Sequence, residues 1–419
     1  MASATPAHPV ADSNRSKHRS GKKRGRRPDD HQHRRLVPRS DVVGTSTFSL
    51  VEHASFSSTG NQGAQPPREA RTEIIRLFHE QPRARSLHPI IRQFRPIPYT
   101  KDGMRKEKAT FLVDKKGQIF FFRSYRARWL MQRSNELEHA FRVLLRDDLT
   151  NDLSDGLRAK HAGGARGSHL PIIIGYHRQS AKAPVLAGWH SKHAIRVQEF
   201  LALSIVQDII RWVASVVQIV FPGVAARFHA DAKWHEQKYG IKPAFGLFWN
   251  FCHNAWFPGQ KRIHCDPHAD MKNQIGVCVL VIYVLAGFEF DDDVYTWLVI
   301  WEAGVVVQLP PWTLAMYPSS LFFHFNIDVD EIEFVSTKGP VFPTPSNSTP
   351  LRHGSDEGRG SMVFFNQSTM CTGSSTGYAT LKEARAHGHS GAIDITLTCQ
   401  EAFERYLELR PMELADLQQ

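Results

Sequence analysis

The sequence is short of cysteine, and its cysteines follow no recognised spacing. Five is an odd number, and no two of them form a C-x-x-C pair. A disulfide framework needs paired cysteines and a structural zinc site needs closely spaced ones, so the pattern argues against both and fits a reducing compartment. The five are Cys252, Cys265, Cys278, Cys371 and Cys399.

Long uncharged apolar runs are also missing. The longest apolar stretch, residues 197–220, is interrupted by Glu199, Asp208 and Arg211, and the N-terminal segment has no apolar core of a secretory signal. The spacing predicts one long amphipathic helix over residues 196–221, ended by the following Pro-Gly pair. We therefore expect no membrane association.

Three common catalytic signatures are absent as well. The chain has no G-x-x-x-x-G-K-[ST] phosphate loop, no G-x-G-x-x-G after a predicted strand and no G-x-S-x-G. These patterns build the phosphate cradle of P-loop enzymes, the dinucleotide site of Rossmann folds and the nucleophile turn of α/β-hydrolases. Chemistry of those three kinds is not expected.

Basic charge, in contrast, is concentrated at one end. Residues 1–40 hold eleven Lys/Arg and three Asp, a net +8 out of +11 for the chain. The segment KHRSGKKRGRRP, residues 17–28, is typical of a nuclear localisation signal or a patch that binds nucleic-acid phosphates. The alternative is a solvated basic leader that carries no localisation signal. We expect residues 1–70 to be disordered, and the protein to lie in the nucleus or otherwise in the cytoplasm.

Short apolar runs rich in Val, Ile, Phe and Trp dominate the chain from Phe245 onward. Eight of them within about 120 residues is the strand count of a double-sheet jelly roll. The runs are FGLFWNFCHNAWF, IGVCVLVIYVL, TWLVIWEA, VVVQL, TLAMYP, LFFHFNI, EFVS and SMVFFNQ. Upstream we expect a hairpin around residues 114–117, a helix over 135–148, a Gly-rich loop over 150–169 and a buried strand over 170–177.

The predicted fold class is therefore α+β, with a double-stranded β-helix (jelly roll) core, a preceding helical layer and a disordered basic tail. We expect order to begin near Glu73. The predicted segments are the tail (1–70), an N-terminal α+β support region (71–240), the jelly-roll core (241–370) and a C-terminal helical extension (371–419).

Two His-x-Asp pairs, His264/Asp266 and His268/Asp270, overlap in the stretch KRIHCDPHADMKN. Both lie between predicted strands. In extended backbone, residues i and i+2 project to the same side, so an imidazole and a carboxylate can share one metal ion. Either pair is a candidate on this ground alone.

A third His-x-Asp pair, His229/Asp231, lies in the stretch FHADAKWHEQKYG, which has a helical pattern. Residues two apart on a helix point roughly 200° away from each other and cannot close on one ion. We therefore expect His229 to be a surface or helix-packing histidine.

A third candidate ligand, His324, follows a Pro-Pro turn and a predicted strand. Two histidines and one carboxylate form a facial triad, the arrangement of non-haem Fe(II) oxygenases. Farther on, GRGSMVFFNQ places Arg359 and Ser361 on one face of the last strand. An arginine can grip a carboxylate with two parallel hydrogen bonds. The alternatives are that His324 is a core histidine packed among phenylalanines and that Arg359 is a surface arginine.

The order H-x-D, then H, then R-x-S on a predicted jelly roll resembles the Fe(II)/2-oxoglutarate-dependent dioxygenases. The segments PHADMKN, WLVIWEAGVVVQLPPWTLAMYPSSLFFHFN and RGSMVFFNQS are similar to an expanded group of fungal 2-oxoglutarate/Fe(II) oxygenase-like proteins, distantly related to the Tet/JBP nucleobase oxygenases. The resemblance covers about residues 245–369 and, more faintly, 110–129.

In that group the ligand pair lies in a P-H-x-D-x-x-N context, which here is residues 267–273. The resemblance therefore implies the second pair, not the first. The implied iron ligands are His268, Asp270 and His324, and the implied cofactor-binding residues are Arg359 and Ser361, the clamp for 2-oxoglutarate, with Asn273. One departure is that 34 residues separate His324 from Arg359, whereas the clamp usually follows much more closely.

We expect an Fe(II)/2-oxoglutarate-dependent dioxygenase that uses O₂ to oxidise a C–H bond, with a nucleobase as the first substrate class and nucleic acid as a partner. One alternative is a catalytically silent jelly-roll scaffold whose basic tail binds nucleic acid, and another is a cupin-type metal enzyme. The run Asp291-Asp292-Asp293 is expected to be a solvated turn, with a calcium site as the alternative.

Overall fold

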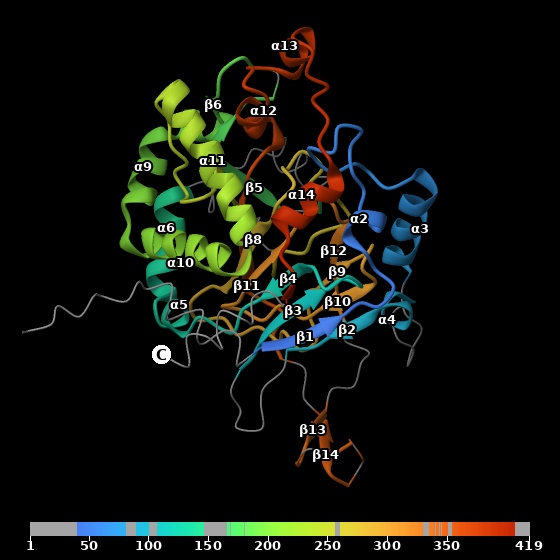
Figure 1. Ribbon diagram of the computed structural model, residues 1–419. Helices are drawn as coiled ribbons and strands as arrows, with labels where there is room; N and C mark the ends of the chain where they lie inside the picture. Colours follow the sequence, from blue (N-terminus) through green and yellow to red (C-terminus); the bar gives the residue numbers. More distant parts are fainter. Residues whose placement is uncertain are drawn as a thin grey trace, which may run out of the picture.

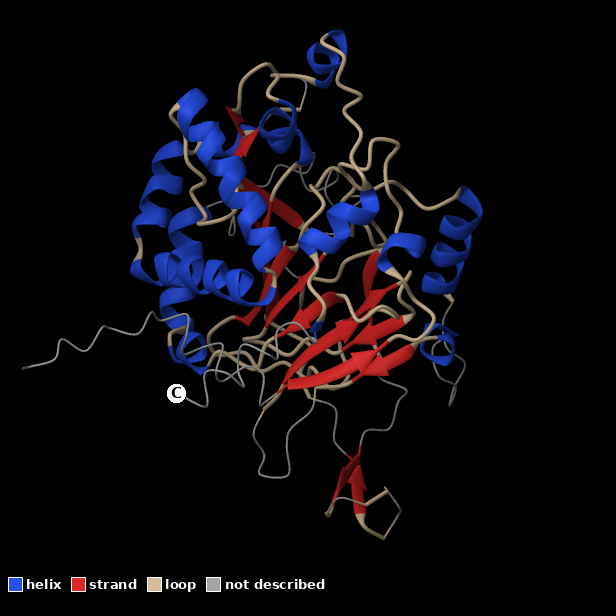
Figure 2. Cartoon of the chain, viewed as in Figure 1, coloured by secondary structure: helices blue, strands red, loops and turns tan. Residues whose placement is uncertain are grey.

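The computed structural model of the chain describes residues 40–80, 89–99, 107–145, 166–167, 169–179, 181–255, 260–329, 335–339, 341–342, 344, 346–350 and 354–406. Two β-sheets form its centre, and helices cover them on one side and at the edges (Figure 1, Figure 2). Helices and strands occur along the whole described chain, which confirms the α+β class.

The larger sheet has nine strands, which are antiparallel except for the first pair. In spatial order they are β1 (Ser40–Gly44), β3 (Ala109–Val113), β4 (Ile119–Arg123), β11 (Leu314–Tyr317), β8 (Cys278–Val284), β15 (Arg359–Phe365), β7 (Asn250–Ala255), β5 (Leu170–His177) and β6 (Val185–Leu186). The predicted hairpin around 114–117 is β3–β4, and the predicted strand over 170–177 is β5.

The smaller sheet has four strands, and a separate hairpin has two. The smaller sheet runs in the order β12 (His324–Ile327), β9 (Trp297–Ile300), β10 (Val305–Val307) and β2 (Arg95–Ile97), the last pair parallel. The hairpin pairs β13 (Val335–Thr337) with β14 (Ser348–Pro350) and projects from the body of the molecule (Figure 1).

From β7 onward the chain passes back and forth between the two sheets, with β9 and β10 consecutive in the smaller one. Strands β7, β8, β11 and β15 belong to the larger sheet, while β9, β10 and β12 belong to the smaller one. Between β7 and β8, His268 bridges to the start of β12. Seven of the eight predicted apolar runs form these strands. The runs are apolar along their length because both faces of the strands are largely buried. The run EFVS instead contributes to the outlying hairpin.

The helices are mostly short, and α10 and α11 are the longest of those described. They are α2 (Leu50–His53), α3 (Arg68–His79), α4 (Pro89–Gln93), α5 (Arg128–Gln132), α6 (Ser134–Leu145), α8 (Gly188–Lys192), α9 (Ala194–Ala202), α10 (Ser204–Val220), α11 (Pro222–Tyr239), α12 (Ser368–Thr376), α13 (Leu381–Ala386) and α14 (Ile395–Ala402). Helices α6, α9, α10 and α11 gather beside the larger sheet (Figure 1). They form the helical layer predicted to precede the core.

The prediction of one helix over residues 196–221 is wrong. Leu203 adopts an extended conformation (φ −70°, ψ 134°), and α9 meets α10 there at a bend of 76°. The Pro-Gly pair does not end the helical region, because Pro222 begins α11, where its missing N–H leaves no hydrogen bond unmade. Among the described helices, none is long and apolar enough by itself to cross a membrane; α9 and α10 reach that length only as the bent pair.

Residues 40–72 are ordered, although order was expected to begin near Glu73, and this corrects the predicted disorder of residues 40–70. Strand β1 pairs with β3, and Phe48 and Leu50 are 2% and 0% exposed in the main core. The burial of these side chains explains why a Ser- and Gly-rich segment is ordered. The basic segment 17–28 lies outside the described residues, as does most of the predicted Gly-rich loop.

The run of three aspartates is not the solvated turn that was predicted. Asp292 is 8% exposed, and its carboxylate accepts hydrogen bonds from Arg126 Nη2 (3.1 Å) and Gln308 Nε2 (2.8 Å). The same Gln308 nitrogen donates to Asp293 Oδ1 (2.8 Å), and the Gly354 amide donates to Asp291. The error arose because three adjacent acids suggest a surface, whereas their partners come from distant segments.

The pair His229/Asp231 is structural. His229 is exposed on α11 and its Nε2 contacts the Gln218 side chain at 3.1 Å, which confirms the prediction of a surface residue. Asp231 is 2% exposed and accepts hydrogen bonds from Trp249 Nε1 (2.7 Å) and Ser374 Oγ (2.6 Å). One carboxylate thus ties α11 to α12 and to the residue before β7.

Replacing Asp231 with alanine is expected to lower the free energy of unfolding by about 3 kcal/mol, because the buried indole N–H and the serine hydroxyl lose their charged acceptor. Urea unfolding of the two variants Asp231→Ala and His229→Ala measures the difference. The His229 variant should stay within about 0.5 kcal/mol of the wild type. Equal stability of the two variants would refute the structural role of Asp231.

Candidate metal centre

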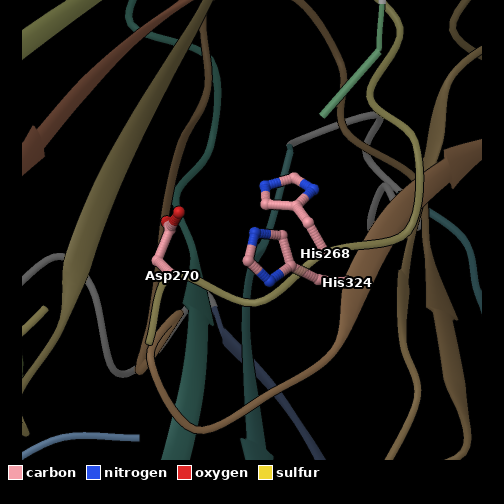
Figure 3. Close-up of side chains that lie close together, drawn as sticks. All are labelled: His268, Asp270 and His324. Carbon is pink, nitrogen blue, oxygen red and sulfur yellow. The ribbon is translucent and has the colours of Figure 1, made fainter. Parts of the chain in front are cut away.

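His268, Asp270 and His324 converge on one point (Figure 3). One ligand atom from each lies within 4.8 Å of the other two. The first two residues lie between β7 and β8, and His324 is the first residue of β12. Within the described part of the chain, this is the only group of three or more His, Cys, Asp or Glu side chains close enough to hold a metal ion.

Backbone hydrogen bonds fix the two histidines relative to each other. The amide of His268 donates to the carbonyl oxygen of His324 (3.1 Å), and the amide of His324 donates to that of His268 (2.8 Å). The imidazole centroids are 4.3 Å apart. The extended segment before the site and the start of β12 therefore set the separation of the rings, as expected for a rigid site.

Each imidazole also has its tautomer set by a carbonyl group. His268 Nδ1 lies 2.7 Å from Asp266 O, and His324 Nδ1 lies 2.9 Å from Phe322 O. Because a carbonyl oxygen can only accept, both Nδ1 atoms carry the proton, and both Nε2 lone pairs remain for a ligand. Such an outer contact is the usual way in which a metal-binding histidine is oriented.

The protonation states suit metal binding. Burial lowers the pKa of His268 to about 3 and also lowers the pKa of His324, so both rings are neutral near pH 7. Burial by itself would raise the pKa of Asp270, but Arg166 and the two histidines outweigh it, and the pKa is lowered. Two neutral imidazoles and one carboxylate are the donor set of an Fe(II), Mn(II) or Zn(II) site.

The overlapping pair His264/Asp266 does not join this group. The His264 ring lies beside the Phe78 ring, with centroids 6.4 Å apart, and burial lowers its pKa to about 4. Cys265, between the two, exchanges backbone contacts with Asn326 of β12: Asn326 N donates to Cys265 O (2.9 Å) and Cys265 N donates to Asn326 Oδ1 (3.0 Å). The first pair thus lies in an extended segment along β12, and the second follows it.

A cavity of about 160 Å³ opens beside the three side chains. Its walls come from both sheets, with β7, β8, β11 and β15 on one side and β9 and β12 on the other. It is lined by the six residues that the resemblance implied: His268, Asp270, Asn273, His324, Arg359 and Ser361. The structure brings these residues together. That three of them bind a metal ion and the other three a co-substrate remains a prediction.

Arg359 is a buried cation with no anionic partner among the residues that the structure describes. It is 3% exposed, its Nη1 makes one long contact with Ile263 O (3.4 Å), and its Nε has no hydrogen-bond partner. No Asp or Glu in the described ranges forms an ion pair with it. Burial lowers its pKa to about 10, so the guanidinium is still charged at neutral pH. A buried charge of this kind is costly unless an anion binds it.

Ser361 and Asn273 are held at the cavity wall by other side chains. Ser361 is 6% exposed and its Oγ accepts a hydrogen bond from Asn254 Nδ2 (3.0 Å), which leaves its hydroxyl proton available for another acceptor. Asn273 Nδ2 donates to Ser319 Oγ (3.3 Å), and the Asn273 amide donates to Asp270 O (2.8 Å). Asn273 thus supports the loop that carries Asp270.

Glu302, in the turn between β9 and β10, holds the residue before His324. Both carboxylate oxygens accept from the Phe323 amide (3.1 and 2.9 Å). Burial raises the pKa of Glu302 to about 8, although hydrogen bonds from the Glu302 and Phe323 amides oppose the shift. Because the folded state keeps the proton above the ordinary pKa near 4.5, the stability contribution of Glu302 is lost as pH rises through about 8.

Glu302→Gln should therefore remove part of the pH dependence of stability. The wild type is expected to lose more free energy of unfolding than the glutamine variant between pH 6 and pH 9, because only the wild type must ionise a buried carboxyl. Urea unfolding of both proteins at the two pH values measures this. Parallel losses would show that the carboxyl ionises normally in the folded protein.

Sequence reasoning missed several residues that line the cavity. Arg166 reaches Asp270 from a segment before β5, Asn254 comes from β7, and Tyr317 of β11 packs its ring against His324, with centroids 5.2 Å apart. No local motif marks Arg166 or Asn254. Tyr317 lies in a predicted strand, but its direction depends on which face of that strand meets the cavity.

No protein-family model matches the chain, and no curated protein matches it. Among solved structures, a similar chain is NgTET1 in complex with 5mC DNA, with 12% sequence identity and a TM-score of 0.38, covering 72% of this chain and 91% of that one.

Proposed function

We propose that this chain is an Fe(II)/2-oxoglutarate-dependent dioxygenase that oxidises a C–H bond of its substrate. One observation carries the proposal: two neutral imidazoles, one ionised carboxylate and one buried guanidinium with no carboxylate partner among the described residues line the same cavity. When bound, the iron and the 2-oxo acid, with O₂ as oxidant, supply the redox chemistry. The protein supplies ligands, a clamp and a largely apolar enclosure.

His268, Asp270 and His324 would hold the iron. The donor set fits because both Nε2 lone pairs are available, and because the buried Oδ1 of Asp270 has no hydrogen bond of normal geometry. Three ligands on one face leave the cavity side open for the co-substrate. Cys252 and Cys265 also line the cavity but lie outside the ligand group, so a thiolate site is not favoured.

Arg359 and Ser361 would bind the far carboxylate of 2-oxoglutarate. Arg359 supplies a desolvated guanidinium with an unused Nε, and Ser361 supplies a hydroxyl donor two residues along the same strand. A carboxylate in this position would neutralise a charge that is otherwise buried without a partner. The long insertion between His324 and Arg359 does not disturb this arrangement, because β13 and β14 lie outside both sheets.

The strand order supports a double-stranded β-helix for the core. Along the chain, β7, the segment at His268, β8, the pair β9–β10, β11, β12 and β15 fall in turn to the larger and the smaller sheet, and the two sheets enclose the cavity. We assign the core to residues 241–370, as predicted from the sequence. The relation to fungal Tet/JBP-like oxygenases remains a prediction.

We propose a nucleobase as the first substrate class. Asn254, Asn273 and Gln367 line the cavity, and carboxamides can donate to and accept from the edge of a base that has left its stack. The basic segment 17–28 would add contacts to phosphates. Nuclear localisation fits the same segment and remains a prediction.

Conversion of 2-oxoglutarate to succinate by the full chain tests the reaction class. We expect succinate formation that requires Fe(II), stops with a chelator and increases with the correct substrate. Oligonucleotides with modified and unmodified bases test the substrate, with a base that gains one oxygen atom as the expected product. Absence of Fe(II)-dependent succinate would leave a jelly-roll scaffold as the better account.

A further inference from the structure

Arg166 approaches the proposed metal site from outside the core strands. Its Nη2 lies 2.9 Å from Asp270 Oδ1, and the side chain lines the same cavity while remaining 55% exposed. The residue precedes His268 by about a hundred positions, in the segment before β5. It is the one cation in ion-pair contact with the triad among the residues that the structure describes.

The backbone at Arg166 is built against the His-x-Asp segment. The Asp266 amide donates to Arg166 O at 3.1 Å. The next residue, Gly167, has φ +100°, and a Cβ there would lie 2.7 Å from His264 O and 3.2 Å from Asp266 N. Only glycine fits this close approach, so the backbone of Arg166 and Gly167 packs directly against residues 264–266, which precede His268 and Asp270.

The orientation of the Asp270 carboxylate depends on the groups that contact it. The Asp270 amide is fixed by Ser319 O (3.1 Å), and the Ser319 side chain hydrogen-bonds to the carboxylate. Oδ1 has no hydrogen bond of normal geometry, and the Arg166 guanidinium lies 2.9 Å from it. A carboxylate oxygen has two lone pairs, so the guanidinium can neighbour Oδ1 while a metal ion uses the other side.

We propose that Arg166 is a positioning residue for the metal-binding carboxylate, which it orients toward the two imidazoles; this inference rests on the metal site proposed above. Arg166 also repels a divalent cation, and the two effects oppose each other. The guanidinium is half exposed, so water and salt screen its repulsion, whereas orientation acts at contact distance. Contacts of this kind typically change metal affinity by about 10- to 100-fold.

Anaerobic titration of the full chain with Co(II), followed by the absorption spectrum of the bound ion, tests the proposal. Arg166→Gln is expected to weaken Co(II) binding about 10-fold and to change the spectrum, because the carboxylate is no longer held in place. Arg166→Lys keeps the charge but not the planar fork and should fall between. Arg211→Gln removes an exposed arginine that pairs with Asp208 on α10 and should bind as the wild type does.

Binding by Arg166→Gln that equals or exceeds wild-type binding would overturn the proposal and identify Arg166 as a competitor of the metal. If the glutamine variant does not fold, the lysine variant decides the question, and wild-type affinity with an unchanged spectrum overturns the proposal. A wild-type chain that binds no Co(II) would instead refute the metal site itself, and the positioning role with it.

Discussion

Replacing His324 with alanine is expected to lower Fe(II)-dependent succinate formation at least about 100-fold. Loss of a contact to a ligand already costs about 10- to 100-fold in metal affinity, and loss of a ligand should cost at least as much. His324 is the proposed ligand on β12, whereas the other two lie together in one loop, so without it only two adjacent donors would remain. Succinate measured at saturating 2-oxoglutarate, together with bound iron, provides the test.

The matched control is His229→Ala, which removes a histidine from the third His-x-Asp pair on the exposed face of α11. It should retain wild-type turnover and wild-type iron content. Unfolding curves for both variants separate loss of the ligand from loss of the fold. Near wild-type turnover by the His324 variant would mean that the chemistry takes place elsewhere or that His324 is only a core residue.

Substitution of Arg359 by glutamine should weaken 2-oxoglutarate binding by about 3 kcal/mol, more than 100-fold, with little change in metal affinity. The expected loss is large because the guanidinium is 3% exposed and has no carboxylate partner in the described protein, so a bound dicarboxylate would supply that partner. Titration of the metal-loaded protein with 2-oxoglutarate measures the dissociation constant.

A 2-oxo acid with a single carboxylate serves as the control ligand for Arg359. It lacks the far carboxylate, so the wild type and Arg359→Gln should bind it with similar, weak affinity. If the variant loses both ligands equally, Arg359 supports the cavity wall and does not clamp the co-substrate. If it loses neither, the co-substrate assignment is wrong.

The core strands could be predicted because nearly every residue in them is buried, so each appears in the sequence as a continuous apolar run. Runs such as CVLVIYV and LAMY are apolar along their whole length. Each forms a strand inside the larger sheet, and the second sheet or the helical layer covers its faces. Helices α9 and α10 were predicted as a single helix because the break at Leu203 has no Pro or Gly to mark it. Strand β1 was missed because its pairing with β3 is a contact between distant segments.

The candidate site was partly readable from the sequence. His268, Asp270 and His324 occur in the expected order, and the helical pattern around His229 already excluded the pair His229/Asp231, but the residues alone left His264/Asp266 as an alternative. What separates them is backbone geometry: the first decoy lies on a helix, and the second runs along β12 ahead of the ligands. Arg166 could not be predicted at all, because its role depends on a contact across about a hundred residues.

We propose that His268, Asp270 and His324 bind one metal ion, and a comparison of the two overlapping His-x-Asp pairs tests this. Fe(II) bound per chain would be measured by anaerobic equilibrium dialysis for the double variants His268→Ala/Asp270→Asn and His264→Ala/Asp266→Asn. We predict about one ion per chain for the wild type and the second variant, and none for the first. Iron retained by the first variant and lost from the second would contradict the claim.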